Sequence, residues 1–135
     1  MSATVLVDSN VFISFLRRGL DPVKLLGDWI GSGDLATCGM VRMEVERGLK
    51  IDRIRRRIGN FFDVLINVPT TNKIWEQATE TAWKLGRSGI TLPAQDILIA
   101  TCAREIGAAV LSDDKHFDEF SDLQIFKPAE EFEEW

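Results

Sequence analysis

The chain has 135 residues, of which 45% are apolar, and a net charge of −5, values typical of a soluble globular domain with its own core. The net charge argues against broad, non-specific binding to nucleic acids. The charge is uneven, however, because residues 1–67 carry 10 Lys and Arg against 8 Asp and Glu, whereas residues 68–135 carry 6 against 13. An acidic protein of this kind can still bind RNA through a local basic face or a metal ion. We expect one domain over residues 1–135.

The predicted elements alternate between short apolar runs and amphipathic stretches. The sequence predicts strands over residues 4–8, 35–38, 65–68, 108–112 and 123–126. It predicts helices over residues 11–18, 22–31, 40–48, 51–65, 71–87 and 94–106, the first of them capped by Asn10. Strands that alternate with helices form a parallel sheet covered on both faces, so the expected fold class is α/β with about five parallel strands.

Two segments carry more specific expectations. In the helix over 71–87, helical spacing places Ile74, Trp75, Ala78, Ala82 and Leu85 on the inward side. The last six residues carry four acidic side chains, so we expect a frayed or loosely docked tail.

Cysteine use and apolar runs bear on the compartment. Cys38 and Cys102 both lie in apolar contexts and neither belongs to a CxxC pair, so we expect both to be buried and reduced. Reduced thiols favour the cytoplasm. Residues 1–20 show no signal peptide, and no apolar run approaches the roughly 18 residues of a membrane span. We therefore expect a cytoplasmic protein that does not enter a membrane.

Four acidic residues lie at the ends of predicted core elements. A carboxylate beside an apolar run loses water, which is costly unless the group is paired or binds a cation. If the strands are parallel, their carboxyl ends meet at one edge of the sheet, where open α/β sheets place their ligands. Converging carboxylates without matching basic partners favour a hard divalent cation. The four residues are Asp8, Glu44, Asp96 and Asp114.

Each of these acids also has an ordinary interpretation. Asp8 follows the first strand, where an Asp often caps the next helix. Asp96 lies in the first turn of its helix, where its charge interacts well with the helix dipole. Glu44 lies in the middle of a helix, where a Glu is usually solvated, and Glu46 competes with it for the site. These interpretations explain each acid separately, but they do not explain why four such carboxylates occur together.

Polar neighbours extend the candidate site. Ser9 and Asn10 follow Asp8 and can orient it or contact a phosphate, and Ser112 offers a similar hydroxyl after the strand over 108–112. Of the adjacent Asp113 and Asp114, one can cap the next turn, and we take Asp114 as the fourth acid.

His116 is the only histidine, and we expect it to be structural beside Phe117. One histidine cannot build a typical zinc site, and no GxSxG sequence supports a Ser-His-Asp triad.

One basic cluster stands out in the first half of the chain. It is either the solvated face of an amphipathic helix or a ridge that contacts RNA phosphates, and the sequence leaves both open. Arg47 and Lys50 lie just before it. We call its four central residues the arginine ridge: Arg53, Arg55, Arg56 and Arg57.

In order and spacing, these motifs resemble those of the PIN-domain nucleases, and in size and layout those of the VapC-type toxins of toxin–antitoxin modules. The resemblance covers essentially the whole chain. Its motifs are Asp8-Ser9-Asn10 after a strand, Glu44-Val-x-x-Gly48 on a helix, Asp96-Ile-Leu-Ile-Ala, and Ser112-x-Asp114-x-x-Phe117 after a late strand. Two departures are mild: Asp113 beside Asp114 blurs the fourth assignment, and Ser9 and Ser112 stand where many members have Thr.

The resemblance implies a PIN-like three-layer sandwich and an endoribonuclease that depends on Mg²⁺ or Mn²⁺. It also implies the toxin of a type II pair, a homodimer and inhibition by a small antitoxin protein. By the motif match, Asp8, Glu44, Asp96 and Asp114 are both the metal ligands and the catalytic residues, and RNA is cleaved by a water that the cation activates.

Two other functions are compatible with parts of the pattern. A haloacid-dehalogenase-like phosphatase would use Asp8 as its nucleophile, but that family usually has a second Asp where this chain has Asn10. A non-catalytic PIN-like scaffold would have lost one of the acidic residues, and none is missing here.

Overall fold

The computed structural model describes residues 3–135, which contain a five-stranded, all-parallel sheet in the order β3-β2-β1-β4-β5. The central strand β1 pairs with β2 on one side and β4 on the other. This sheet confirms the predicted α/β class. The strands are β1 (Thr4–Val7), β2 (Asp34–Cys38), β3 (Ile66–Val68), β4 (Ala109–Leu111) and β5 (Ile125–Phe126).

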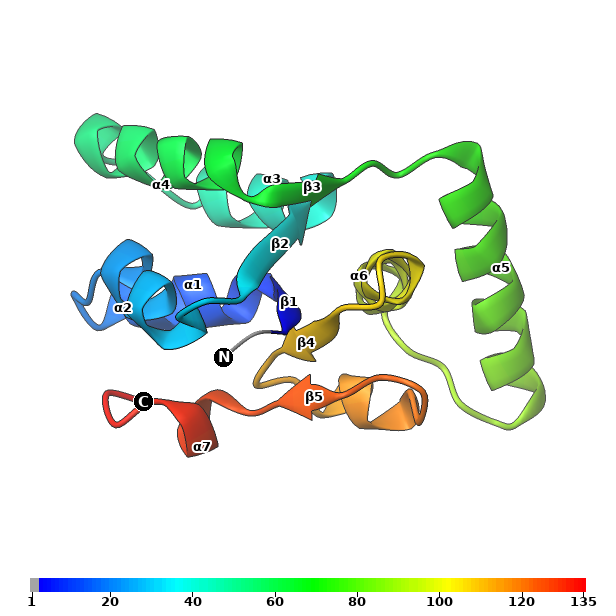
Figure 1. The fold of residues 1–135 in the computed structure, drawn as a ribbon. Helices are drawn as coiled ribbons and strands as arrows, with labels where there is room; N and C mark the ends of the chain where they lie inside the picture. The colour runs from blue at the N-terminus through cyan, green and yellow to red at the C-terminus, as the bar shows by residue number, and fades with distance from the viewer. Residues whose placement is uncertain (1–2) are drawn as a thin grey trace.

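Helices cover both faces of the sheet, as Figure 1 shows, with α1 and α2 on one side and α6 on the other, where α5 lies outside α6. Among the described residues, no helix is both long enough and apolar enough to cross a membrane. The helices are α1 (Ser9–Arg17), α2 (Pro22–Ile30), α3 (Gly39–Arg47), α4 (Asp52–Val64), α5 (Asn72–Arg87), α6 (Ala94–Glu105) and α7 (Pro128–Glu131), with a 3-10 helix η1 (Lys115–Glu119).

The apolar character of β1 follows from its central place. Val5, Leu6 and Val7 are almost fully buried because helices cover both sides of the strand, so both of its faces must be apolar. The next residue, Asp8, follows the last residue of β1 at the carboxyl edge of the sheet and is itself buried. The sheet therefore carries a buried acid at the end of its central strand. The two cysteines are free and buried, as expected.

The first helix starts two residues earlier than predicted. Asp8, not Asn10, is its N-cap, and the Asp8 carboxylate accepts a hydrogen bond from the backbone N–H of Ser9. The prediction of Asn10 as the cap was therefore wrong, because the preceding Asp already satisfies the free N–H groups at the start of the helix.

The prediction for α5 was partly wrong. Ile74 and Ala78 are buried against α6, but Trp75 is 49% exposed and Ala82 is also exposed. Residues 75 and 82 lie about 100° round the helix from 74, so a helix that packs through one narrow stripe leaves them in solvent.

The acidic tail is not frayed. Trp135 packs edge-on against Phe15 at 5.4 Å between ring centroids, and the guanidinium of Arg18 donates to the Trp135 carbonyl at 2.7 Å. Phe132 is buried and contacts the rings of Phe15 on α1 and Trp29 on α2. Aromatic side chains thus fix a segment whose charges alone suggested disorder.

Candidate functional site

Asp8 occupies the centre of the carboxyl edge of the sheet and is only 4% exposed. One carboxylate oxygen, Oδ1, accepts from the backbone N–H of Ser9 at 2.7 Å, and the other, Oδ2, accepts from the Ser112 hydroxyl at 2.8 Å. Capping α1 and contributing to the site are therefore compatible roles. Asp8 is held rigidly by groups on α1 and on the loop after β4.

The ionisation of Asp8 reflects its burial and its acidic neighbours. Burial is the main cause that raises the pKa of Asp8 to about 6, and the negative charges of Asp96 and Glu44 contribute to the rise, while hydrogen bonds from Ser112 and Ser9 oppose it. The carboxylates of Glu44 on α3 and Asp96 on α6 are thus close enough to that of Asp8 to repel it.

Glu44 and Glu46 have different surroundings on α3. The Ser9 hydroxyl lies 3.3 Å from Oε1 of Glu44 and 3.4 Å from Oδ1 of Asp8, so it links these two acids. Glu46 instead forms ion pairs with Arg42 at 2.7 Å and with Arg55 at 3.4 Å. Glu44 therefore faces the site, and the charge of Glu46 is neutralised elsewhere.

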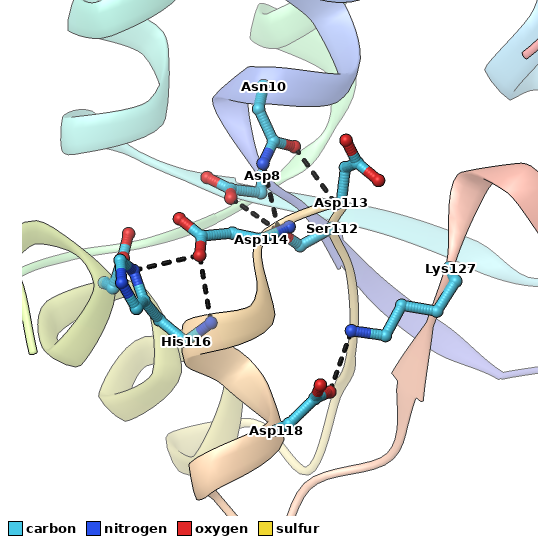
Figure 2. Close-up of polar contacts among 9 residues, drawn as sticks. Asp8, Asn10, Ser112, Asp113, Asp114, His116, Asp118 and Lys127 are labelled. Carbon is cyan, nitrogen blue, oxygen red and sulfur yellow. Dashed lines mark hydrogen bonds and ion pairs between the residues drawn. The ribbon is translucent and has the colours of Figure 1, made fainter.

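Asp96 and Asp114 meet through His116. Nδ1 of the His116 ring lies 2.7 Å from Oδ2 of Asp96 and 2.9 Å from Oδ1 of Asp114. Burial raises the pKa of Asp96, as does the charge of Asp114, while the bond from His116 lowers it. The same bond to Asp96 raises the pKa of His116. Figure 2 shows Asp114, His116 and Asp8 at this edge.

Ser112 connects Asp8 and Asn10 to Asp114 through hydrogen bonds. It is fully buried, its hydroxyl donates to Asp8, and it accepts from the Asn10 amide at 3.2 Å and the backbone N–H of Asp114 at 2.9 Å. With its donor and both acceptor positions engaged, Ser112 is suited to positioning the acids.

The neighbouring acids Asp113 and Asp114 point in different directions (Figure 2). The Asp113 side chain is exposed, and its backbone N–H contacts Asn10 at 3.4 Å. Asp114 instead caps η1, where its Oδ1 accepts from the backbone N–H of His116 at 2.9 Å. The carboxylate of Asp114 is therefore the one of the two that meets Asp96 and His116.

His116 is the residue that sequence reasoning missed. It was expected to be structural beside Phe117, but its ring lies between two of the four acids. The available signal was its position two residues after Asp114, which η1 turns back toward α6.

A groove runs from Glu44 along α1, α3 and the start of α4 and has a volume of about 460 Å³. Its lining includes apolar side chains, such as Leu16 and Ile54, and the basic residues Arg17, Arg47 and Lys50. The groove thus places basic side chains next to an acid of the site.

The arginine ridge lies on α4 and all four side chains are exposed or half-exposed. Arg57 pairs with Asp21 at 2.6 Å and Arg55 with Glu46 at 3.4 Å. Arg53 and Arg56 form no ion pair with any residue in the described range 3–135. These two guanidinium groups are therefore available for an outside partner.

The carboxylates of the site have no Lys or Arg partner anywhere in residues 3–135. Carboxylate oxygens at close range fit a hard divalent cation, which would relieve the desolvation and repulsion that raise the pKa values of Asp8 and Asp96. The donor set therefore fits the cation predicted from the sequence, and Asp8, Glu44, Asp96 and Asp114 are the groups that could hold it.

Comparisons with known proteins bear on the family and the fold of this chain. The sequence matches the PIN domain over residues 5–123. No curated protein matches it.

Several solved structures have the same fold. VapBC from Salmonella typhimurium, solved bound to DNA, has a TM-score of 0.75 at 18% identity. The match covers 94% of this chain and 98% of the VapBC chain. VapBC2 from Rickettsia felis, solved bound to a DNA fragment from its promoter, has a TM-score of 0.74 at 16% identity. This match covers 92% of this chain and 98% of the VapBC2 chain. A toxin–antitoxin complex from Klebsiella pneumoniae has a TM-score of 0.71 at 17% identity. This match covers 92% of this chain and 97% of the matched chain. The match to the family extends from β1 to the residues before β5 and takes in every acid of the site, so the chain belongs to the PIN domain family.

Proposed function

We propose that the protein is a divalent-metal-dependent endoribonuclease and the toxin of a type II toxin–antitoxin pair. The observation that carries the proposal is the convergence of Asp8, Glu44, Asp96 and Asp114 at the carboxyl edge of the sheet, where burial and mutual repulsion raise the pKa of Asp8 to about 6. Membership of the PIN family and the likeness to solved VapBC structures support it. The phosphatase alternative has no comparable support, because Asn10 replaces its second acid.

The four carboxylates would hold Mg²⁺ or Mn²⁺, which when bound supplies charge for a phosphodiester oxygen and activates a water. Asp8 is fixed for this task by Ser9 and Ser112, and Asp114 by its cap on η1. Ser9 orients Glu44 toward Asp8. The protein thus needs no nucleophile of its own, and its residues keep the oxygen ligands in place.

We propose two protein partners. Relatives solved as VapBC or as a toxin–antitoxin complex support a small cognate antitoxin for this chain. The groove beside Glu44, lined by apolar and basic side chains, is compatible with a protein partner as well as with RNA. A homodimer is a further part of the proposal and is testable by light scattering of the purified protein.

RNA cleavage in the presence and absence of metal tests the proposed function. Purified protein is incubated with structured RNAs in Mn²⁺, in Mg²⁺ and in EDTA. We expect cleavage with either ion and none in EDTA. Cleavage that continues undiminished in EDTA would rule out the metal mechanism.

Glu44 and Glu46 provide a matched pair of substitutions on one helix. Because Glu44 contacts Ser9 at the site and Glu46 pairs with Arg42 and Arg55, we expect Glu44→Gln to slow RNA cleavage by roughly 10- to 100-fold or more. Glu46→Gln should leave the rate within about threefold and instead cost about 1 kcal/mol of stability through its lost ion pairs. Cleavage rates of both variants test the expected loss of activity, and melting curves test the expected loss of stability. An essential Glu46 beside a dispensable Glu44 would mean that the site is assigned to the wrong face of α3.

The arginine ridge is expected to supply affinity for RNA and not chemistry. Replacing Arg53 and Arg56 together by Gln should weaken RNA binding and reduce the slope of log affinity against log salt by about 0.7–0.9 per lost phosphate contact. The rate at saturating RNA should hardly change, because the acids are untouched. The double change Lys84→Gln and Arg87→Gln, on exposed positions of α5, is the control. A salt slope equal to that of the wild type would identify the ridge as solvated surface.

A further inference from the structure

His116 places a nitrogen atom among the oxygen atoms of the site. One potential ligand atom each from Asp96, Asp114 and His116 lie within 4.8 Å of one another. Nδ1 lies 2.7 Å from the Asp96 oxygen and 2.9 Å from the Asp114 oxygen. Neighbouring ligands of an octahedral ion with bonds of about 2.0–2.1 Å are about 3 Å apart. Nδ1 therefore already has the spacing from both oxygens that ligands of one cation have.

The surroundings of His116 hold the ring in this position but leave it accessible. Its backbone N–H donates to Asp114 at 2.9 Å, and the adjacent Phe117 is fully buried and anchors η1 in the core. The side chain of His116 is 43% exposed, whereas that of Asp96 is 9% exposed. An ion arriving from solvent thus meets the imidazole together with two fixed carboxylates.

A hydrogen bond from Nδ1 accounts for only one of its two close contacts, because Asp114 Oδ1 already accepts from the backbone N–H of His116. Nδ1 can carry at most one hydrogen, yet two carboxylate oxygens lie within 3 Å of it. A cation among the three atoms would accept electron pairs from both oxygens and from the ring nitrogen at the same time. The three atoms are therefore placed so that a cation can replace the Nδ1 hydrogen and bind all of them.

We propose that His116 binds the divalent cation directly through Nδ1, as a nitrogen ligand beside Asp96 and Asp114. His116 takes this role within the proposed metal-dependent function and so rests on it. Because imidazole suits transition-metal ions and Mg²⁺ prefers oxygen, the nitrogen shifts the preference of the site away from Mg²⁺ and toward transition-metal ions. His116 is then a determinant of which metal the protein uses.

Electron spin echo spectroscopy of bound Mn²⁺ tests this bond without any activity measurement. His116 is the only histidine in the sequence, so in protein without an affinity tag every imidazole signal comes from it. We expect modulation from a directly bound ¹⁴N nucleus, a changed pattern when the protein contains ¹⁵N-histidine, and no such signal in His116→Ala. Mn²⁺ that binds without nitrogen modulation overturns the proposal.

Calorimetric titration gives an independent measure. His116→Ala and His116→Gln should weaken Mn²⁺ binding by at least about tenfold, the lower end of what even an outer contact to a metal ligand contributes. Mg²⁺ binding should weaken less, and the exposed control Asp113→Asn should bind both ions like the wild type.

The results separate the role of His116 from the function on which it rests. Mn²⁺ binding that is lost in Asp96→Asn but unchanged in both His116 variants overturns only the role of His116. A wild-type protein that binds no Mn²⁺, or binding that survives Asp96→Asn, overturns the metal site and the role of His116 together.

Discussion

Replacing Asp96 by Asn is expected to slow RNA cleavage by at least about 1,000-fold while the protein stays folded. A divalent cation contributes several kcal/mol of charge stabilisation, and each 1.4 kcal/mol or so is a factor of ten in rate. Asp96 is 6% exposed, and its carboxylate is one of the two that meet His116. Asparagine has nearly the same shape but lacks the charge that holds the ion.

The matched control is Asp113→Asn, which removes the same charge from an exposed neighbour of Asp114. Its cleavage rate should stay within about threefold of the wild type. Single-turnover rates with excess protein, and circular dichroism of both variants, make the comparison. Full activity in Asp96→Asn would remove Asp96 from the site, and full loss in Asp113→Asn would move the fourth acid by one residue.

Replacing Asp8 by Asn is expected to stabilise the metal-free protein at pH 7. Burial raises the pKa of Asp8 from 3.8 to about 6, so ionising it at neutral pH costs the folded state about 3 kcal/mol relative to the unfolded chain. The uncharged amide removes that cost, but its single oxygen can accept from only one of Ser9 and Ser112, which offsets roughly 1–2 kcal/mol. The net gain of about 1–2 kcal/mol corresponds to a rise of roughly 3–8 °C in Tm.

The sign of the pH dependence follows from the direction of the shift. Between pH 3.8 and about 6 the folded protein holds a proton on Asp8 that the unfolded chain has already lost, so stability falls as pH rises through this window. The other acids near Asp8 are Glu44 and Asp96, and they remain in the variant. Urea unfolding in EDTA at several pH values should therefore show a shallower fall for Asp8→Asn. A Tm of the variant well below that of the wild type at pH 7 contradicts the proposed cost of ionising Asp8 through its burial and its acidic neighbours.

Much of the site could be predicted because it follows from the sheet. Asp8 ends a run of buried apolar residues, and in a parallel sheet such an end must lie at the same edge as the end of β4, which precedes Asp114. Asp96 was placed by its position at the start of an apolar helix. The distinction between Glu44 and Glu46 came from motif spacing alone. Its physical basis, the ion pairs of Glu46 with Arg42 and Arg55, requires the packing of α3 on α4.

The misses share a cause, which is that side-chain surroundings depend on contacts between distant segments. His116 joins the site because η1 packs on α6, a contact that its position two residues after Asp114 does not by itself determine. Trp75 and Ile74 fit helical spacing equally well, and only the line of contact between α5 and α6 selects Ile74 for burial. The tail looked disordered by charge, yet Phe132 and Trp135 find aromatic partners on α1 and α2.

Cleavage of an RNA with a single 2′-deoxyribose at the mapped cleavage position tests the central claim most directly. If the four acids hold a cation that activates a water, the 2′-hydroxyl takes no part in the reaction. The substituted RNA should then be cut in Mn²⁺ at a rate within about threefold of the unmodified RNA, and neither should be cut in EDTA. Loss of cleavage at the deoxy position would show that the 2′-hydroxyl is the nucleophile and contradict a metal-activated water at Asp8, Glu44, Asp96 and Asp114.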